Sequence, residues 1–196
     1  SGVGFFGKAN GVIKKLTVKD SYFEGEKNVG GIVGSIGKVG TDKAAPESIT
    51  IENCVNYADV TAENTVAGII GYPFGNTNSD NNQFITVTIS KCVNHGDVTG
   101  TKGNGYAGGI AGYSDGYIAQ CKNESYVSGY CASFADSIST AGGIAGYVKN
   151  SDVYGCENNG EIAGLQGVYA GGIAGLSVLD NGGHKIYECL NNGNVS

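Results

Sequence analysis

Residues 142–146 read Gly142-Gly143-Ile144-Ala145-Gly146, and this short run of small residues is the feature from which the architecture can be worked out. Runs of the same kind occur five times along the 196-residue chain. They lie at residues 30–34, 67–71, 108–112, 142–146 and 171–175, so successive runs end 29 to 41 residues apart. A sequence that repeats at this period builds a solenoid, a propeller or another array, in which each repeat packs mainly on its neighbours.

A second set of positions repeats with the first and follows the template Ile-x-x-Cys-x-Asn-x-x-x-Val. The shared cysteines and asparagines are Cys54, Cys92, Cys121, Cys156, Cys189, Asn56, Asn94, Asn123, Asn158 and Asn191. The branched residues before and after them are Ile51, Ile89, Ile118, Val153, Ile186, Val60, Val98, Val127, Ile162 and Val195. A divergent sixth copy opens the chain, and we expect Ile13, Leu16, Val18 and Tyr22 at its template positions, with Leu16 in place of cysteine.

The template favours β-strands that turn corners. Residues 48–52 and 84–90 alternate apolar and polar residues and are rich in β-branched side chains, which is typical of half-buried strands. The Ile-x-x-Cys spacing then breaks the period of two, so the two residues between must turn a corner if both anchors point inward. This predicts an all-β parallel β-helix of about six coils that forms one domain over residues 1–196. The approximate coils are 1–29, 30–66, 67–106, 107–140, 141–169 and 170–196.

Stacked coils place equivalent residues one above another at the roughly 4.8 Å spacing of neighbouring strands. We therefore expect inward ladders of the branched residues and cysteines, and a ladder of asparagine amides at a bend, each bonded to the next. The glycine runs leave one question open, because both of their faces carry small or apolar residues. The sequence does not indicate which face is buried.

The repeat resembles the GLUG-type repeats of bacterial cell-surface proteins, in which Gly-Gly-(Ile/Leu)-x-Gly-Tyr alternates with Ile-x-x-Cys-x-Asn-x-Gly-x-Val. Residues 108–113 with Cys121, and residues 142–147 with 156–162, are the parts most similar to that pattern. The resemblance covers nearly the whole chain and implies a right-handed β-helix. It also implies a setting in adhesin-like surface proteins or beside the catalytic domain of IgA-specific zinc metallopeptidases. The chain departs from the pattern in its first copy and in insertions at 35–48 and 72–83.

The composition narrows the classes of partner. The chain has a formal net charge of −6 and no arginine-rich patch, which disfavours a surface that tracks nucleic-acid phosphates. No apolar run approaches the roughly 20 residues that a transmembrane helix needs. Because the chain begins and ends inside a repeat, we expect a fragment of a longer protein that continues into further repeats or domains. The expected location is outside a bacterial cell, either secreted or anchored at its surface.

The six cysteines raise the possibilities of disulfides and metal binding. Five of them occupy one repeat position without the Cys-x-x-Cys spacing of a zinc site, and parallel side chains about 4.8 Å apart exceed the usual Cβ separation in a disulfide. We expect free core thiols, no metal and no cofactor. Cys131 lies outside the repeat and is expected to be exposed or to pair.

Several other residue types suggest chemistry without forming a recognised motif. His95 and His184 lie outside any His-Glu-x-x-His sequence and are expected at the surface. Asp59 and Asp97 share a template position, but no basic residue shares it, so solvated charge is the expected reading. Residues 76–82 are rich in oxygen ligands yet lack the order of a calcium-binding EF-hand loop. The glycosylation triplet Asn123-Glu124-Ser125 is uninformative about function in a chain that is expected to be bacterial.

Tyr72, Tyr113 and Tyr147 each follow a glycine run in three consecutive coils. They are predicted to stack, either as a structural ladder or, with the insertion at 73–83, as a binding surface for a host surface protein or glycan. Our leading hypothesis is a noncatalytic module of a bacterial adhesin-like protein that serves as a stalk, a binding surface or both. The alternatives are an exosite or spacer domain of an IgA-type zinc metallopeptidase and a carbohydrate-active β-helix enzyme.

Overall fold

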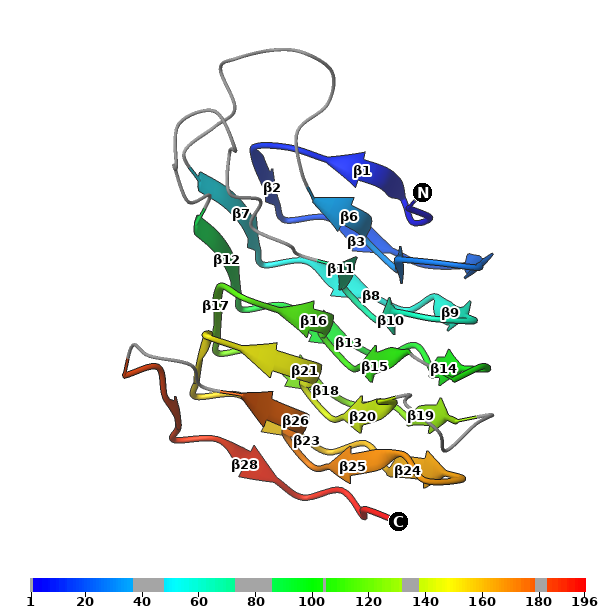
Figure 1. The fold of residues 1–196 in the computed structure, drawn as a ribbon. Helices are drawn as coiled ribbons and strands as arrows, with labels where there is room; N and C mark the ends of the chain where they lie inside the picture. Colours follow the sequence, from blue (N-terminus) through cyan, green and yellow to red (C-terminus); the bar gives the residue numbers. More distant parts are fainter. Residues whose placement is uncertain (1, 37–47, 73–85, 104, 132–137, 179–182) are drawn as a thin grey trace, which may run out of the picture.

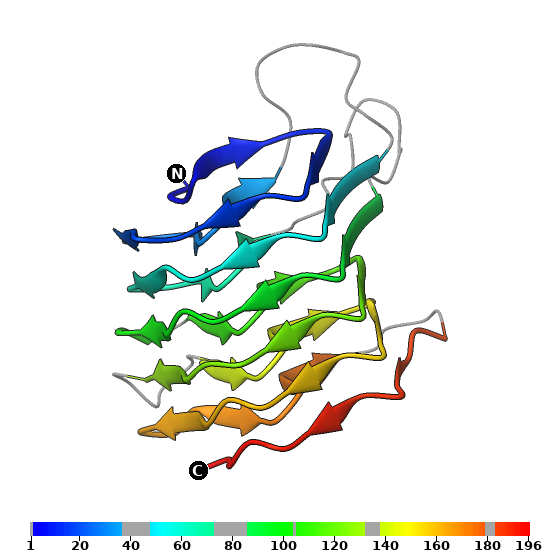
Figure 2. The same ribbon diagram turned by 180° about the vertical axis from the view of Figure 1, so that it is seen from behind.

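The computed structural model describes residues 2–36, 48–72, 86–103, 105–131, 138–178 and 183–196. These residues form 28 short strands and no helix. The strands make five parallel sheets, each of which receives one strand from successive coils (Figure 1). Figures 1 and 2 show the coils stacked from the N-terminus to the C-terminus as a right-handed solenoid. The predicted all-β parallel β-helix of about six coils is confirmed.

We call the five sheets A to E, in the order in which each coil passes through them. The first strand of the chain, β1, lies in sheet B. Sheet A contains β5 (Val29–Gly30), β10 (Val66–Ala67), β15 (Tyr106–Gly108), β20 (Thr140–Gly142) and β25 (Tyr169–Gly171). Sheet B contains β1 (Phe6–Ala9), β6 (Val33–Ile36), β11 (Ile70–Tyr72), β16 (Ala111–Ser114), β21 (Ala145–Lys149) and β26 (Ala174–Val178). Sheet C contains β2 (Val12–Lys14), β7 (Ser48–Glu52), β12 (Thr86–Ser90), β17 (Tyr117–Ala119), β22 (Asp152–Tyr154) and β27 (Ile186–Tyr187).

The last two sheets carry the template asparagines and the branched residues that follow them. Sheet D contains β3 (Thr17–Val18), β8 (Val55–Asn56), β13 (Val93–Asn94), β18 (Lys122–Asn123), β23 (Glu157–Asn158) and β28 (Leu190–Asn191). Sheet E contains β4 (Tyr22–Gly25), β9 (Asp59–Ala62), β14 (Val98–Gly100), β19 (Val127–Tyr130) and β24 (Ile162–Leu165). Equivalent residues pair across coils, as Asn56 with Asn94 and Asn94 with Asn123 show.

A left-handed backbone residue turns the corner between sheets C and D in every coil. This residue directly precedes the cysteine position and has φ between 52° and 57° in all six coils. The six residues are Lys15, Asn53, Lys91, Gln120, Gly155 and Glu188. One residue in this conformation redirects the strand, which explains physically why the Ile-x-x-Cys spacing departs from the period of two.

The interior contains two apolar clusters. The larger one packs between sheets B, C and D, and includes the isoleucine of the glycine runs, which is fully buried as Ile32, Ile69, Ile110 and Ile144. The smaller cluster packs between sheets E and A around Val60, Val66 and Val98. The sequence left open which face of the glycine runs is buried, and the middle runs are buried on both faces. Ile110 and its neighbour Ala111, like Ile144 and Ala145, all lie in the larger cluster with 0% of their surface exposed.

The first coil differs from the expected alignment. Ile13 pairs with Ile51 and Val18 pairs with Asn56 as the template predicts. Tyr22, however, pairs with Asp59, and Phe23 takes the place opposite Val60. The expectation for Tyr22 is wrong because the first coil has one more residue than the second between sheets D and E.

Candidate binding surface

An asparagine ladder runs through the solenoid between the two apolar clusters. Each side-chain nitrogen donates to the side-chain oxygen of the next coil, over 2.9 Å from Asn56 to Asn94, 2.9 Å from Asn94 to Asn123 and 2.8 Å from Asn123 to Asn158. The ladder continues from Asn158 to Asn191 over 2.8 Å. Each nitrogen also donates to a backbone carbonyl two residues further along its own chain, so the buried amides have their hydrogens satisfied.

The glycine runs provide the space for this ladder. A Cβ added to Gly109 would lie 2.4 Å from the Asn123 side-chain carbon and 2.2 Å from the Gly143 carbonyl oxygen. The same clash recurs between Gly68 and Asn94, at 2.1 Å. The second residue of each run must therefore be glycine for the amide to fit beneath it.

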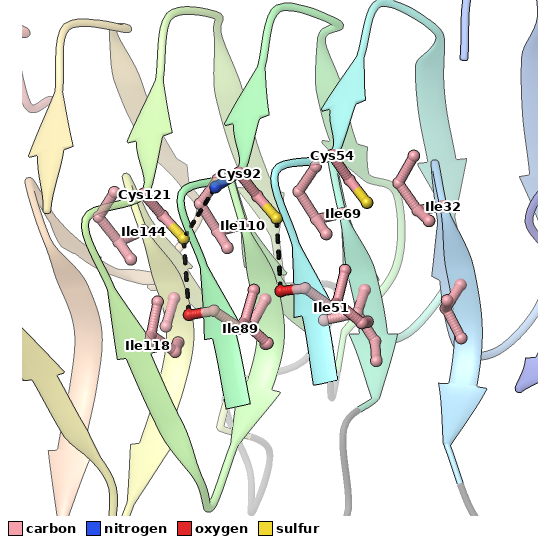
Figure 3. Packing of buried hydrophobic residues seen from close by; sticks show 14 of the residues in the cluster. Ile32, Ile51, Cys54, Ile69, Ile89, Cys92, Ile110, Ile118, Cys121 and Ile144 are labelled. Atoms are coloured by element: carbon pink, nitrogen blue, oxygen red, sulfur yellow. Dashed lines mark hydrogen bonds between the residues drawn. The ribbon is translucent and has the colours of Figure 1, made fainter. Parts of the chain in front are cut away.

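The template cysteines lie beside the branched residues of sheet C (Figure 3). The Cys92 sulfur lies 3.7 Å from the Ile51 carbonyl oxygen, and the Cys121 sulfur lies 3.7 Å from that of Ile89, so each thiol donates to the preceding coil. All six cysteines are free thiols, and burial raises the pKa of the Cys121 thiol. These contacts make the sulfurs part of the core.

Cys131 lies in the interior, whereas His95 and His184 lie at least partly at the surface. Cys131 is buried, with 1% of its surface exposed, so the expectation that it is exposed is wrong. It directly follows strand β19, and its amide donates to the Leu165 carbonyl of the next coil. His95 is exposed, and the partly exposed His184 lies with its Nδ1 3.4 Å from an Asp152 carboxylate oxygen.

The three tyrosines singled out by the sequence lie together on sheet B. The ring centroids of Tyr72 and Tyr113 are 5.0 Å apart, and those of Tyr113 and Tyr147 are 5.3 Å apart. Tyr113 is 8% exposed, whereas Tyr72 and Tyr147 are half-buried. The middle ring therefore supports its neighbours, and the outer two rings offer the accessible surface.

Tyr106 is a fourth member that the sequence analysis missed. It lies on sheet A, yet its ring is 5.2 Å from that of Tyr147 and 6.1 Å from that of Tyr113. Glycines bring the two sheets together, because a Cβ on Gly146 would lie 2.8 Å from the Ala107 backbone nitrogen. We call Tyr72, Tyr106, Tyr113 and Tyr147 the tyrosine strip. Its signal in the sequence was an aromatic residue two positions before a glycine run.

The phenols of Tyr72, Tyr106 and Tyr113 are held in their neutral form. Burial is the first cause that raises the pKa of Tyr72, Tyr106 and Tyr113, and the neighbouring Asp115 carboxylate raises the pKa of Tyr72 and Tyr113 further. Neutral phenols present an aromatic face and a hydroxyl group at physiological pH. Such groups suit hydrogen bonding and apolar contact with a partner.

The expected solvated charges occupy the turn between sheets D and E. Asp59 and Asp97 are exposed, and the Asp97 amide donates to an Asp59 carboxylate oxygen over 2.9 Å. The Ser125 hydroxyl donates in turn to the Asp97 carboxylate. Each of these two carboxylates thus accepts a hydrogen bond from a residue of the next coil. Asn123, the residue of the glycosylation triplet, is fully buried in the asparagine ladder.

Two further sequence expectations, the oxygen-rich residues 76–82 and the insertion at 73–83, lie outside the described residues. Within the described ranges, no group of three or more histidine, cysteine, aspartate or glutamate side chains is placed to hold a metal ion. The same ranges contain no helix that is long and apolar enough to cross a membrane.

The chain was also compared with known proteins. The searches against family models, curated proteins and solved structures found no significant match.

Proposed function

We propose that this solenoid is a noncatalytic, surface-exposed repeat module of a bacterial adhesin-like protein, secreted or anchored at the cell surface. It serves as a stalk and presents the tyrosine strip to a host surface protein or glycan. The observation that carries the proposal is the strip itself, in which four rings from sheets A and B each have their centroid 5.0 to 6.1 Å from that of at least one neighbour. The resemblance to GLUG-type repeats supplies the biological setting.

The scaffold supports a binding role. Tyrosines give a large contact area and lose little conformational entropy on binding, because each has only two side-chain torsions. Here those torsions are already restricted by neighbouring rings and by the parallel strands beneath them. A pre-ordered aromatic surface of this kind lowers the entropic cost of association.

The test removes the two accessible rings of sheet B. The double variant Tyr72→Ser/Tyr147→Ser removes two half-buried rings and leaves the half-buried Tyr106 and the buried Tyr113 in place. The double variant Tyr154→Ser/Tyr187→Ser is the matched control, since those two rings form a similar pair 4.8 Å apart on sheet C. Both proteins and the wild type are screened on arrays of host extracellular proteins and glycans.

We expect binding by the wild type and the control, and a loss of about tenfold or more in the strip variant, as for aromatic hot spots. Equal binding by all three proteins with intact folds would exclude the strip. An absence of binding by the wild type would contradict the adhesive role. Turnover of a polysaccharide by the wild type would replace the proposal with the enzyme alternative.

A further inference from the structure

An open hollow lies at the turn between sheets D and E, on a different part of the molecule from the tyrosine strip. It has a volume of about 390 Å³ and is lined by Lys19, Asp20, Ser21, Tyr57 and Asp59. Its walls come from the first and second coils. The volume is within the range of sites that hold small ligands.

The hollow follows from the extra residue of the first coil. In the second and third coils the asparagine oxygen accepts from the backbone amide two residues on, at Ala58 and Gly96, which holds the turn tight. The first coil has Val18 at the asparagine position and cannot form this bond. Its longer turn instead places Asp20 in the left-handed region, at φ 53°. The hollow therefore exists because the first coil has a longer turn than the other coils and lacks the asparagine that would tighten it.

Tyr57 provides a fixed aromatic wall. Its ring stacks on that of His95 in the third coil, with centroids 4.6 Å apart and planes 9° from parallel. The side facing the first coil borders the hollow, and 51% of the residue is exposed. Stacking on one face thus orients the ring and leaves surface available for a ligand.

The polar groups around the ring are available for hydrogen bonding. One Asp59 oxygen accepts the Asp97 amide, while its other oxygen has no hydrogen-bond partner among the described residues. The Lys19 ammonium and the Asp20 carboxylate likewise form no ion pair with any side chain in the part of the chain that the structure describes. The hollow therefore combines one strong donor and two acceptors with an apolar ring face.

We propose that this hollow binds one neutral saccharide unit, with a face of the sugar ring on Tyr57 and its hydroxyl groups on Lys19, Asp20 and Asp59. The electron-rich face of a tyrosine attracts the weakly positive C–H groups on one side of a sugar ring. Hydroxyl groups both donate and accept, so they match the mixed polar lining. The two carboxylates outnumber the single ammonium, which disfavours sialylated or sulfated sugars. The site goes beyond the tyrosine strip and does not depend on it.

The test uses the full chain and the methyl glycosides of glucose, galactose, mannose and N-acetylglucosamine as probes. Amide chemical shifts are followed by NMR during each titration. We expect at least one glycoside to shift the amides of residues 19–21 and 57–59. Tyr57→Ala should weaken this binding by about tenfold, whereas Tyr57→Phe should change it less than about threefold, because the ring carries the contact.

Two comparisons keep the outcome clear. Tyr169→Ala removes another exposed tyrosine, from sheet A, and should leave the titration unchanged. The strip variant Tyr72→Ser/Tyr147→Ser should also bind the glycoside normally, so failure of either proposal is distinguishable from failure of the other. The proposal is overturned if none of the four glycosides shifts these amides. It is also overturned if binding survives in a folded Tyr57→Ala protein, or if N-acetyl-lysine methylamide binds there and the sugars do not.

Discussion

At the scale of single residues, the left-handed conformation before each cysteine determines how much stability is lost when a glycine there is replaced. Gly155 adopts φ 57°, and a Cβ there would meet only the Gln120 side chain, at 3.7 Å. Gly155→Ala should therefore lower the free energy of unfolding by about 1 kcal/mol through backbone strain alone. Denaturant unfolding followed by circular dichroism measures this change.

Gly100→Ala is the matched control for that substitution. Gly100 has no left-handed φ, pairs with Ala62 in the neighbouring coil, and has its nearest contact for a new Cβ at 3.4 Å. Alanine there should leave stability unchanged or raise it by about 0.5 kcal/mol, because it restricts the unfolded chain. Equal losses of stability at both positions would show that the added methyl group, and not the left-handed corner conformation, governs the effect.

At the scale of elements, the asparagine ladder links sheet D across the coils. Asn123→Ala would leave the Asn94 side-chain nitrogen and the Asn158 side-chain oxygen without their ladder partners inside the protein. Each unmade buried bond costs about 1 to 3 kcal/mol, so we expect a loss of about 2 to 4 kcal/mol in unfolding free energy. The melting temperature and urea midpoint of the variant measure it.

The exposed end of the ladder supplies the comparison. Asn191 accepts from Asn158 but is itself exposed, so water replaces its bonds in Asn191→Ala and the loss should stay below about 1 kcal/mol. Similar losses at Asn123 and Asn191 would mean that the amides act individually and that burial of the ladder contributes little.

At the scale of the whole molecule, the features that repeat along the chain, including the ladders between coils, were predictable from the sequence, whereas contacts between opposing sheets were not. The spacing of Ile51 and Cys54 predicts the corner, because a straight strand could not point both of these side chains into the interior. The contact of Gly109 with Asn123 was not predictable, since spacing along the chain does not say which sheets oppose each other. Tyr106 was missed because it joins the strip from a different sheet. The hollow beside Tyr57 was missed because it depends on one extra residue between sheets D and E of the first coil.

The stacked architecture also predicts the order in which the thiols react. Each coil of a solenoid is stabilised by its neighbours, so opening begins at the ends of the stack and reaches the middle last. Cys189 is only partly buried and lies in the last described coil, whereas Cys92 and Cys121 lie in central coils and are 0% and 1% exposed. A thiol reagent added to the native protein should label Cys189 first and the central pair slowest, as mass spectrometry of digested samples can follow.

Denatured, unreduced protein should yield all six cysteines as free thiols. Simultaneous labelling of all positions would indicate that the solenoid opens as one cooperative unit, and fewer than two free thiols would mean that the cysteine ladder is bridged.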